Sequence, residues 1–180
     1  AVARADSWTS FYDNARLAVE LLFWIGFESH QDAPQLFIAP ELIEQTKEQG
    51  HGVPSPMLSV RGLERPALEK LLAQCNQVLP ESRQLHIALI NARTNHIVAG
   101  PAASLCGLSH VLAELQAAGE KDQTRIPFSQ RKPAVTHSFL PISTPFHTPY
   151  LQAASQRIKE RLADRAFSAD QLQVPVLHTA

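Results

Sequence analysis

The segment from Met57 to Ser143 most constrains the fold, because two hydrophobic periodicities alternate along it in a definite order. Short apolar runs are typical of buried strands, and leucines three or four positions apart are typical of one helix face. The predicted order is strand, helix, strand, strand, helix, strand. These elements span residues 57–60, 63–79, 85–90, 96–99, 101–119 and 135–143.

This β-α-β-β-α-β order is the order of a ferredoxin-like domain. Residues 91–95 are short and polar enough for a hairpin-like connection between the second and third strands. We therefore expect residues 57–143 to form a four-stranded antiparallel sheet with two helices on one face. Met57–Val60 and Val135–Ser143 should then belong to the same sheet.

The flanking residues carry weaker patterns. Residues 7–25 have the spacing of an amphipathic helix, with Gly26 as its expected end. Apolar residues cover much of this helix near Leu21–Ile25, which predicts burial on several sides. Residues 29–56 read as irregular apart from a short helix at 40–49, and later segments predict a helix at 149–166 and a strand at 173–177.

Composition excludes several classes of function. A chain of 180 residues can bury a proper core as one domain or two small ones. A formal net charge of −1 and a pI near 6.8 argue against nucleic acid or an anionic membrane as the main partner. No apolar run approaches the roughly 20 residues of a membrane helix, and no signal peptide is apparent.

The two cysteines, Cys75 and Cys106, lack the spacing of metal ligands and fall in helix-like stretches. They are typical of reduced thiols in a cytoplasmic protein. Neither a glycine-rich phosphate loop nor a metal-ligand pattern occurs in the sequence. We therefore predict no metal and no bound cofactor. Because the sequence begins without methionine, we also expect it to be a piece of a longer protein.

His147 is the candidate catalytic residue. It follows an apolar run, Phe139-Leu-Pro-Ile, and lies between Pro145 and Pro149. Each proline fixes its own φ and biases the preceding residue away from helix, so the backbone beside the imidazole should be stiff. A histidine held in this way can act as a general base. The alternative is a histidine that only satisfies a turn.

Several blocks of the sequence closely resemble the acetyl (starter-unit) acyltransferase domain of fungal-type fatty acid synthase β subunits. The resemblance extends in order over essentially all 180 residues. The matching blocks are Gly52–Ser59, Asn91–Gly100, Thr124–Lys132, Phe139–Pro141 and Pro145–His147.

The resemblance implies a fold, a reaction and its partners. It implies that the ferredoxin-like subdomain, residues 57–143, is inserted in an α/β-hydrolase-like subdomain. Residues 1–56 would then belong to the nucleophile side of that subdomain, and residues 144–180 to a return segment carrying His147. The implied substrates are acetyl-CoA or another neutral acyl-CoA and the phosphopantetheinyl thiol of an acyl carrier protein, within a large synthase complex.

By the same resemblance, His147 is the base of a Ser–His dyad. The family takes its serine from a Gly-His-Ser-x-Gly turn, and no two glycines in this chain have the spacing of Gly-x-Ser-x-Gly. We expect that serine to lie upstream of Ala1, so the segment alone should be inactive. Ser55, Ser59 and Ser143 are more simply explained as turn or strand hydroxyls.

The resemblance also indicates three substrate-binding candidates. Ile25 stands where malonyl-specific relatives carry an arginine that pairs with the malonyl carboxylate, which favours a neutral acyl group here. Asn91 aligns with a block beside the acyl pocket, although turn chemistry alone could explain it. Arg125 begins a basic run with Arg131 and Lys132 that could contact coenzyme A phosphates or an acidic carrier, or simply face solvent.

Two other functions remain open from the sequence. One is a starter transferase of a dedicated synthase that feeds polyketide assembly, where the acyl chain could be longer. The other is a non-catalytic ferredoxin-like binding module, because such folds serve many functions. A base held between two prolines favours the enzyme over the binding module.

Overall fold

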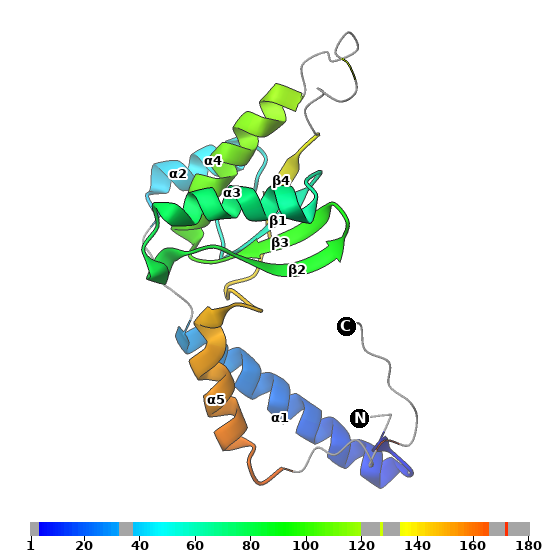
Figure 1. Ribbon diagram of the computed structural model, residues 1–180. Helices are drawn as coiled ribbons and strands as arrows, with labels where there is room; N and C mark the ends of the chain where they lie inside the picture. The colour runs from blue at the N-terminus through cyan, green and yellow to red at the C-terminus, as the bar shows by residue number, and fades with distance from the viewer. Residues whose placement is uncertain (1–3, 33–37, 120–126, 128–133, 166–171, 173–180) are drawn as a thin grey trace. The chain divides into compact units, whose positions relative to one another are not determined.

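A computed structural model describes residues 4–32, 38–119, 127, 134–165 and 172. The chain forms two compact units, Ala1–Asp32 with Gln152–Ala180 and Ala33–Leu151 (Figure 1). The elements of the second unit are α2 (Pro40–Glu48), β1 (Met57–Arg61), α3 (Arg65–Gln77), η2 (Glu81–Arg83), β2 (His86–Ala92), β3 (Asn95–Ala99), α4 (Ala102–Gly119), β4 (Thr136–Phe139) and η4 (Pro149–Leu151).

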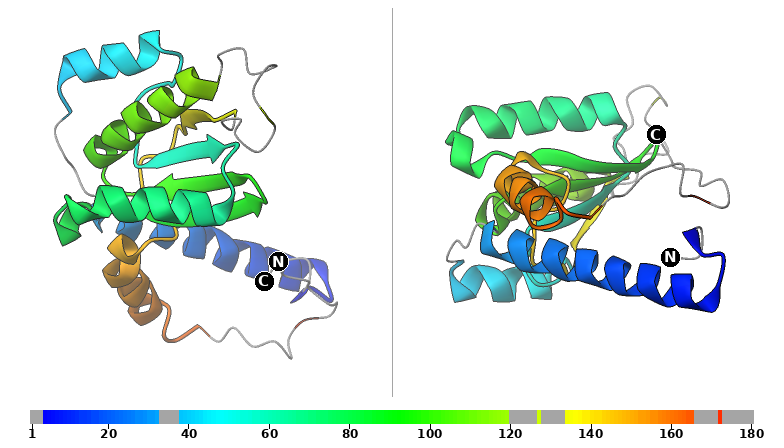
Figure 2. Two further views of the ribbon diagram at one scale, coloured as in Figure 1. Left: turned by 45° about the horizontal axis from the view of Figure 1, so that its top comes forward. Right: turned by 90° about the horizontal axis from the view of Figure 1, so that it is seen from below.

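The four strands form one antiparallel sheet in the order β2-β3-β1-β4 (Figure 2). The central strand β1 pairs with β3 on one side and with β4 on the other, so that Leu58 lies opposite both Val98 and Phe139. The predicted element order is confirmed, as is the prediction that the first and last strands share a sheet. The last strand is shorter than predicted, because after Phe139 the chain turns away through Leu140 and Pro141.

The main core lies between the sheet and helices α3 and α4. Alternate residues of β1 and β3, which point to the same face of the sheet, meet the leucines of both helices. Because helical leucines at a spacing of three or four share a face, both helices bury one side on the sheet. The central members of this core are Leu58, Val60, Leu68, Leu72, Val98, Leu105, Leu108 and Leu112.

A smaller apolar cluster lies on the opposite face of the sheet. Met57, Ile97 and Ala99 point to this face and are covered by Leu140, Ile142 and Phe146. Backbone and side-chain bonds hold the covering segment, since the amide of Leu140 donates to Met57 and Ser55 Oγ donates to the carbonyl of Leu140 at 2.6 Å. The segment that leads to His147 is thus packed on the sheet.

In its described residues, the other unit contains two helices, α1 (Trp8–Asp32) and α5 (Gln152–Arg161). The prediction that the first helix ends at Gly26 is wrong, because α1 continues for six residues to Asp32. The helix also has exposed apolar residues, among them Trp8, Leu22 and Phe23, so the predicted burial on several sides is wrong as well. Among the described elements α5 covers one side of α1, which leaves this apolar surface open.

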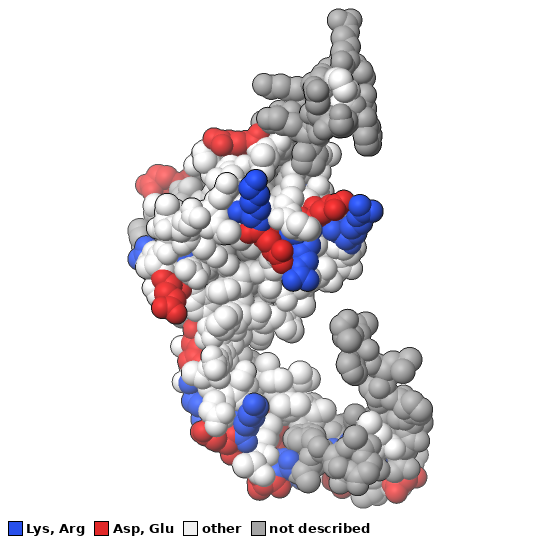
Figure 3. Space-filling view, viewed as in Figure 1, with Lys and Arg blue, Asp and Glu red and all other residues white. Residues whose placement is uncertain are grey.

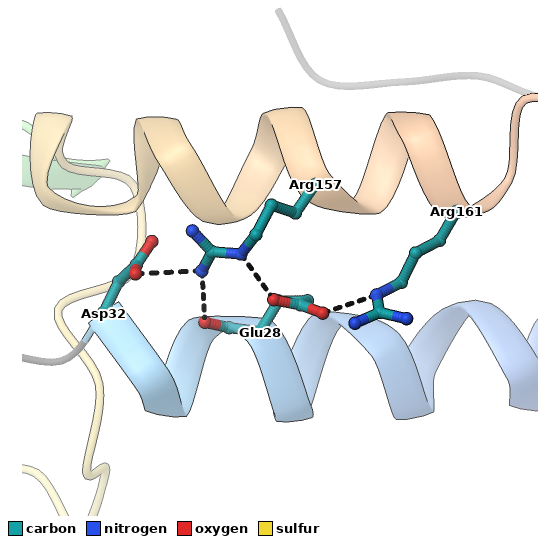
Figure 4. Close-up of polar contacts among 4 residues, drawn as sticks. All are labelled: Glu28, Asp32, Arg157 and Arg161. Atoms are coloured by element: carbon teal, nitrogen blue, oxygen red, sulfur yellow. Dashed lines mark hydrogen bonds and ion pairs between the residues drawn. The ribbon is translucent and has the colours of Figure 1, made fainter.

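An ionic cluster at the end of α1 explains why the helix continues past Gly26. The carboxylate of Glu28 is only 1% exposed and accepts one bond from Arg157 Nε and one from Arg161 Nε, both at 2.6 Å (Figure 4). Arg157 also pairs with Asp32 at 2.9 Å. The bond to Arg157 is the main reason that the pKa of Glu28 is lowered. These contacts with α5 offset the cost of about 1 kcal/mol of an interior glycine.

The remaining predicted elements differ from the structure in their bounds or lie outside the described residues. The helix predicted at 149–166 consists of η4 followed by α5, and it ends at Arg161. The strand predicted at 173–177 lies outside the described residues. In the described part of the chain, no helix is both long and apolar enough to cross a membrane.

Candidate functional site

His147 lies in a tight turn between η4 and the segment, Leu140 to Phe146, that covers the second face of the sheet. Its φ is +59°, and it is the only described residue other than glycine with a positive φ. Left-handed backbone in such a residue costs about 1–3 kcal/mol and persists only where surrounding contacts impose it. Its side chain is exposed. An exposed imidazole on a strained backbone is typical of a functional turn.

The residues before His147 are held on the sheet. Phe146 packs against the cluster of Met57, Ile97 and Ala99, and its amide donates to the carbonyl of Thr144 at 2.9 Å. Thr148 Oγ1 donates to the carbonyl of Pro145 at 2.6 Å, which closes the turn around His147. These contacts impose the position of the turn from its upstream side.

The residues after His147 are held at the start of β2. Tyr150 Oη donates to the carbonyl of Gln84 at 2.8 Å. The Tyr150 ring meets the His86 ring edge-on, with centroids 5.7 Å apart. Burial raises the pKa of Tyr150 and lowers that of His86. A recess of about 410 Å³ adjoins this contact; its lining includes Pro149, Tyr150, His86 and Gln84.

The other predicted site residues lie elsewhere. Ile25 is half-buried in the middle of α1, in the unit that does not contain His147. Asn91 is exposed at a shift of register in β2, roughly 17 Å along that strand from His86. The strand extends to Ala92, so Asn91 is not in the hairpin turn as predicted. Arg125 lies outside the described residues.

His51, Ser109 and His137 form a buried polar cluster that no sequence pattern indicates. The two imidazoles stack with centroids 3.9 Å apart, and His51 Nδ1 donates to the carbonyl of His137 at 3.3 Å. Ser109 Oγ and His137 Nε2 are hydrogen-bonded at 2.8 Å. Burial and, secondarily, the charge of His51 lower the pKa of His137 to about 4. His51 is buried because its loop docks on β4, where its carbonyl accepts from the amide of Phe139 at 2.8 Å.

The cysteines have no features of nucleophiles. Cys75 is half-buried and Cys106 is buried, and neither forms a disulfide. Burial raises the pKa of Cys75, and it raises that of Cys106 to about 11. A thiol with a raised pKa carries little thiolate at neutral pH. Ser55 Oγ donates to the carbonyl of Leu140, and Ser109 Oγ is hydrogen-bonded to His137 in the buried cluster.

Charges on the described surface are balanced. Figure 3 shows acidic and basic side chains next to one another on the face in view. Two of the pairs on the sheet unit are Arg65–Glu69 and Arg93–Glu64, both at 2.7 Å and both well exposed. In the described part of the chain, no three His, Cys, Asp or Glu side chains are placed to hold a metal ion.

Residues 1–133 match the family described as "Starter unit:ACP transacylase in aflatoxin biosynthesis". The chain belongs to this family. It is 49% identical over 176 residues to the fatty acid synthase beta subunit pigK of Monascus ruber and 38% identical over 181 residues to the fatty acid synthase subunit beta of Saccharomyces cerevisiae. These alignments cover 98% and 99% of the chain and 9% of each relative, so the chain spans about a tenth of the relatives' length.

Solved structures of similar fold include the malonyl CoA-acyl carrier protein transacylase of Clostridium perfringens and FabD of Acinetobacter baumannii. The first has a TM-score of 0.55 at 13% identity and covers 83% of this chain and 35% of its own. The second has a TM-score of 0.51 at 20% identity, and the match covers 81% of this chain and 35% of the FabD chain. At this identity the likeness concerns the fold alone, a mixed α/β architecture shared with acyltransferases.

Proposed function

We propose that this chain is part of an acyltransferase that moves a neutral starter acyl group from coenzyme A to the phosphopantetheinyl thiol of an acyl carrier protein. The observation that carries the proposal is His147, an exposed histidine with a left-handed backbone in a turn held from both sides. Membership of the starter unit:ACP transacylase family supports the same reaction class.

In this mechanism His147 accepts the proton of a serine hydroxyl as that oxygen attacks the acyl thioester. The acyl group forms an ester with the serine, and the protonated His147 gives its proton to the sulfur of coenzyme A, which leaves as a thiol. The neutral His147 then takes the proton of the carrier thiol, whose sulfur attacks the ester, and returns that proton to the departing serine oxygen. The serine would come from sequence outside these 180 residues, because the chain has no Gly-x-Ser-x-Gly.

The proposed architecture follows from the sheet. A β-α-β-β-α-β unit with strand order β2-β3-β1-β4 supports a ferredoxin-like subdomain over residues 57–143. We propose that residues 1–56 and 144–180 belong to a larger α/β-hydrolase-like subdomain, and that the parent protein is a multifunctional fatty acid synthase subunit of the cytoplasm. Asn91 and Arg125 remain proposed contacts for substrate or carrier.

A role in polyketide assembly is the second candidate, because the matching family is described by its place in aflatoxin biosynthesis. The two candidates differ in the length of the acyl chain that is transferred. Comparing acetyl-CoA with hexanoyl-CoA as donors to the complete parent protein separates them. Preference for the longer chain would assign the protein to a dedicated synthase.

The test of the neutral substrate is Ile25→Arg in the complete parent protein. An arginine there should pair with a malonyl carboxylate and have no partner with acetyl. A charge-assisted bond contributes about 1.5–3 kcal/mol, so the malonyl-to-acetyl ratio of kcat/KM should rise about 10- to 100-fold. The ratio is the quantity to measure, because losses of folded protein cancel in it.

The control in the same protein is His147→Ala, which should abolish transfer of both acyl groups. Retained transfer in His147→Ala would contradict the proposed base. An unchanged ratio in Ile25→Arg, with transfer still dependent on His147, would contradict only the position of Ile25 beside the acyl group.

A further inference from the structure

Three residues after His147, a side chain bonds to a distant part of the same unit. Upstream, Phe146 is packed on the sheet, but the imidazole itself is exposed. Downstream, the first side chain that bonds to a different part of the unit is Tyr150, through the carbonyl of Gln84. Gln84 follows η2 and lies two residues before β2, whose first residue, His86, pairs with Ala99 in the sheet.

The link between Tyr150 and His147 is short and stiff. Pro149 has a fixed φ, and the residue before a proline is restricted to extended conformations. Thr148 is further held by its hydroxyl bond to the carbonyl of Pro145, and the amide of Leu151 donates to the carbonyl of Thr148. Few backbone dihedrals remain free between the anchored phenol and the backbone of His147.

The hydroxyl of Tyr150, rather than the packing of its ring, sets its place. The ring borders a recess of about 410 Å³, so it has open space to move into on one side. The ring of Tyr150 meets the ring of His86 edge-on, and this contact by itself would let the two rings slide past each other. The hydrogen bond of 2.8 Å to Gln84 is directional and fixes one position.

We propose that Tyr150 is a positioning residue, whose bond to the Gln84 carbonyl holds His147 in the left-handed conformation needed for proton transfer. This inference rests on the proposed function, in which His147 is the base. Displacement of a general base by even a fraction of an ångström slows proton transfer without changing how acyl-CoA binds.

The test is Tyr150→Phe in the complete parent protein, which keeps the ring and removes the donor. Rapid mixing with radiolabelled acetyl-CoA gives the rate and the amplitude of acyl-enzyme formation. We expect the acylation rate to fall about fivefold or more, consistent with the loss of one hydrogen bond, and KM for acetyl-CoA to stay within about twofold. The amplitude, which counts competent sites, should remain that of the unmodified protein.

The matched control is Tyr12→Phe, the same chemical change at an exposed residue of α1, which should alter neither rate nor amplitude. An unchanged rate in Tyr150→Phe would overturn the proposal. A reduced amplitude with an unchanged rate would overturn it too, because the hydroxyl would then serve folding alone. The variant His147→Ala distinguishes a failure of the Tyr150 inference from a failure of the proposed function. If His147→Ala still forms acyl-enzyme at the normal rate, the proposed function itself fails.

Discussion

His137 shows at the scale of one residue how burial changes chemistry. The residue is 7% exposed, and its ring stacks on His51 and bonds to Ser109. A second proton on this imidazole would leave a buried charge beside another histidine, which is why its pKa falls to about 4. The cluster therefore requires His137 to be neutral.

We expect the stability of the fold to decrease as pH falls from about 6.5 to 4. In that range the unfolded chain binds a proton at position 137 and the folded chain does not, so protonation favours unfolding. The contribution is on the order of 2 kcal/mol. It is measured by urea denaturation at pH 7.5 and 4.5.

Other groups titrate over the same range, so the comparison is between variants. His137→Gln should lose part of the pH dependence. His110→Gln, a change at an exposed histidine of α4, should retain all of it. Equal pH dependence in wild type and His137→Gln would contradict the assignment.

At the scale of elements, the Glu28 cluster joins α1 to α5. A buried carboxylate is stable only when its charge is paired, and here Arg157 and Arg161 provide two bonds from consecutive turns of one helix. Arg161 also lies over the ring of Trp24, 4.2 Å from its centroid. The helix pair is thus held by contacts between residues that are far apart in the sequence, with separations of 129 and 133 positions.

We expect Glu28→Gln to lower the melting temperature, because two arginines lose their buried partner while the side-chain volume is kept. Thermal unfolding by circular dichroism at pH 7 measures the effect. Glu20→Gln on the same helix is the matched control, since Glu20 is more exposed and its contact with Arg165 is 3.7 Å. If both variants lose the same amount, the cluster does not hold α5 on α1.

At the scale of the whole molecule, the chain spans about a tenth of its relatives' length and has no Gly-x-Ser-x-Gly. The apolar surface of α1, with Trp8 77% and Leu22 66% exposed, is extensive for a chain that acts alone. These observations support the proposal that the chain acts as part of a longer protein.

We expect the isolated 180-residue chain to form no acyl-enzyme, because no Gly-x-Ser-x-Gly serine is present and both of its thiols have raised pKa values. Incubation with radiolabelled acetyl-CoA, followed by precipitation and counting, measures this. The complete parent protein serves as the positive control. Stable stoichiometric labelling of the isolated chain would identify one of its own serines or cysteines as the nucleophile.

The sequence by itself determined the sheet unit. Among the described residues between Met57 and Phe139, its apolar periodicity predicted each strand and α-helix to within about four residues, but not the short η2, because alternation and three-to-four spacing directly reflect which face is buried. It also identified His147 as a candidate, since a proline two residues away on each side of a histidine is a local feature of the sequence.

Only the tertiary structure decided the features that depend on distant residues. Gly26 is a good helix terminator by propensity, but α1 continues because Glu28 meets two arginines of α5. His51 and His137 stack although 86 positions separate them, and Tyr150 meets Gln84 across 66 positions. No local pattern records such contacts, because their energy arises only when the packed sheet brings the segments together.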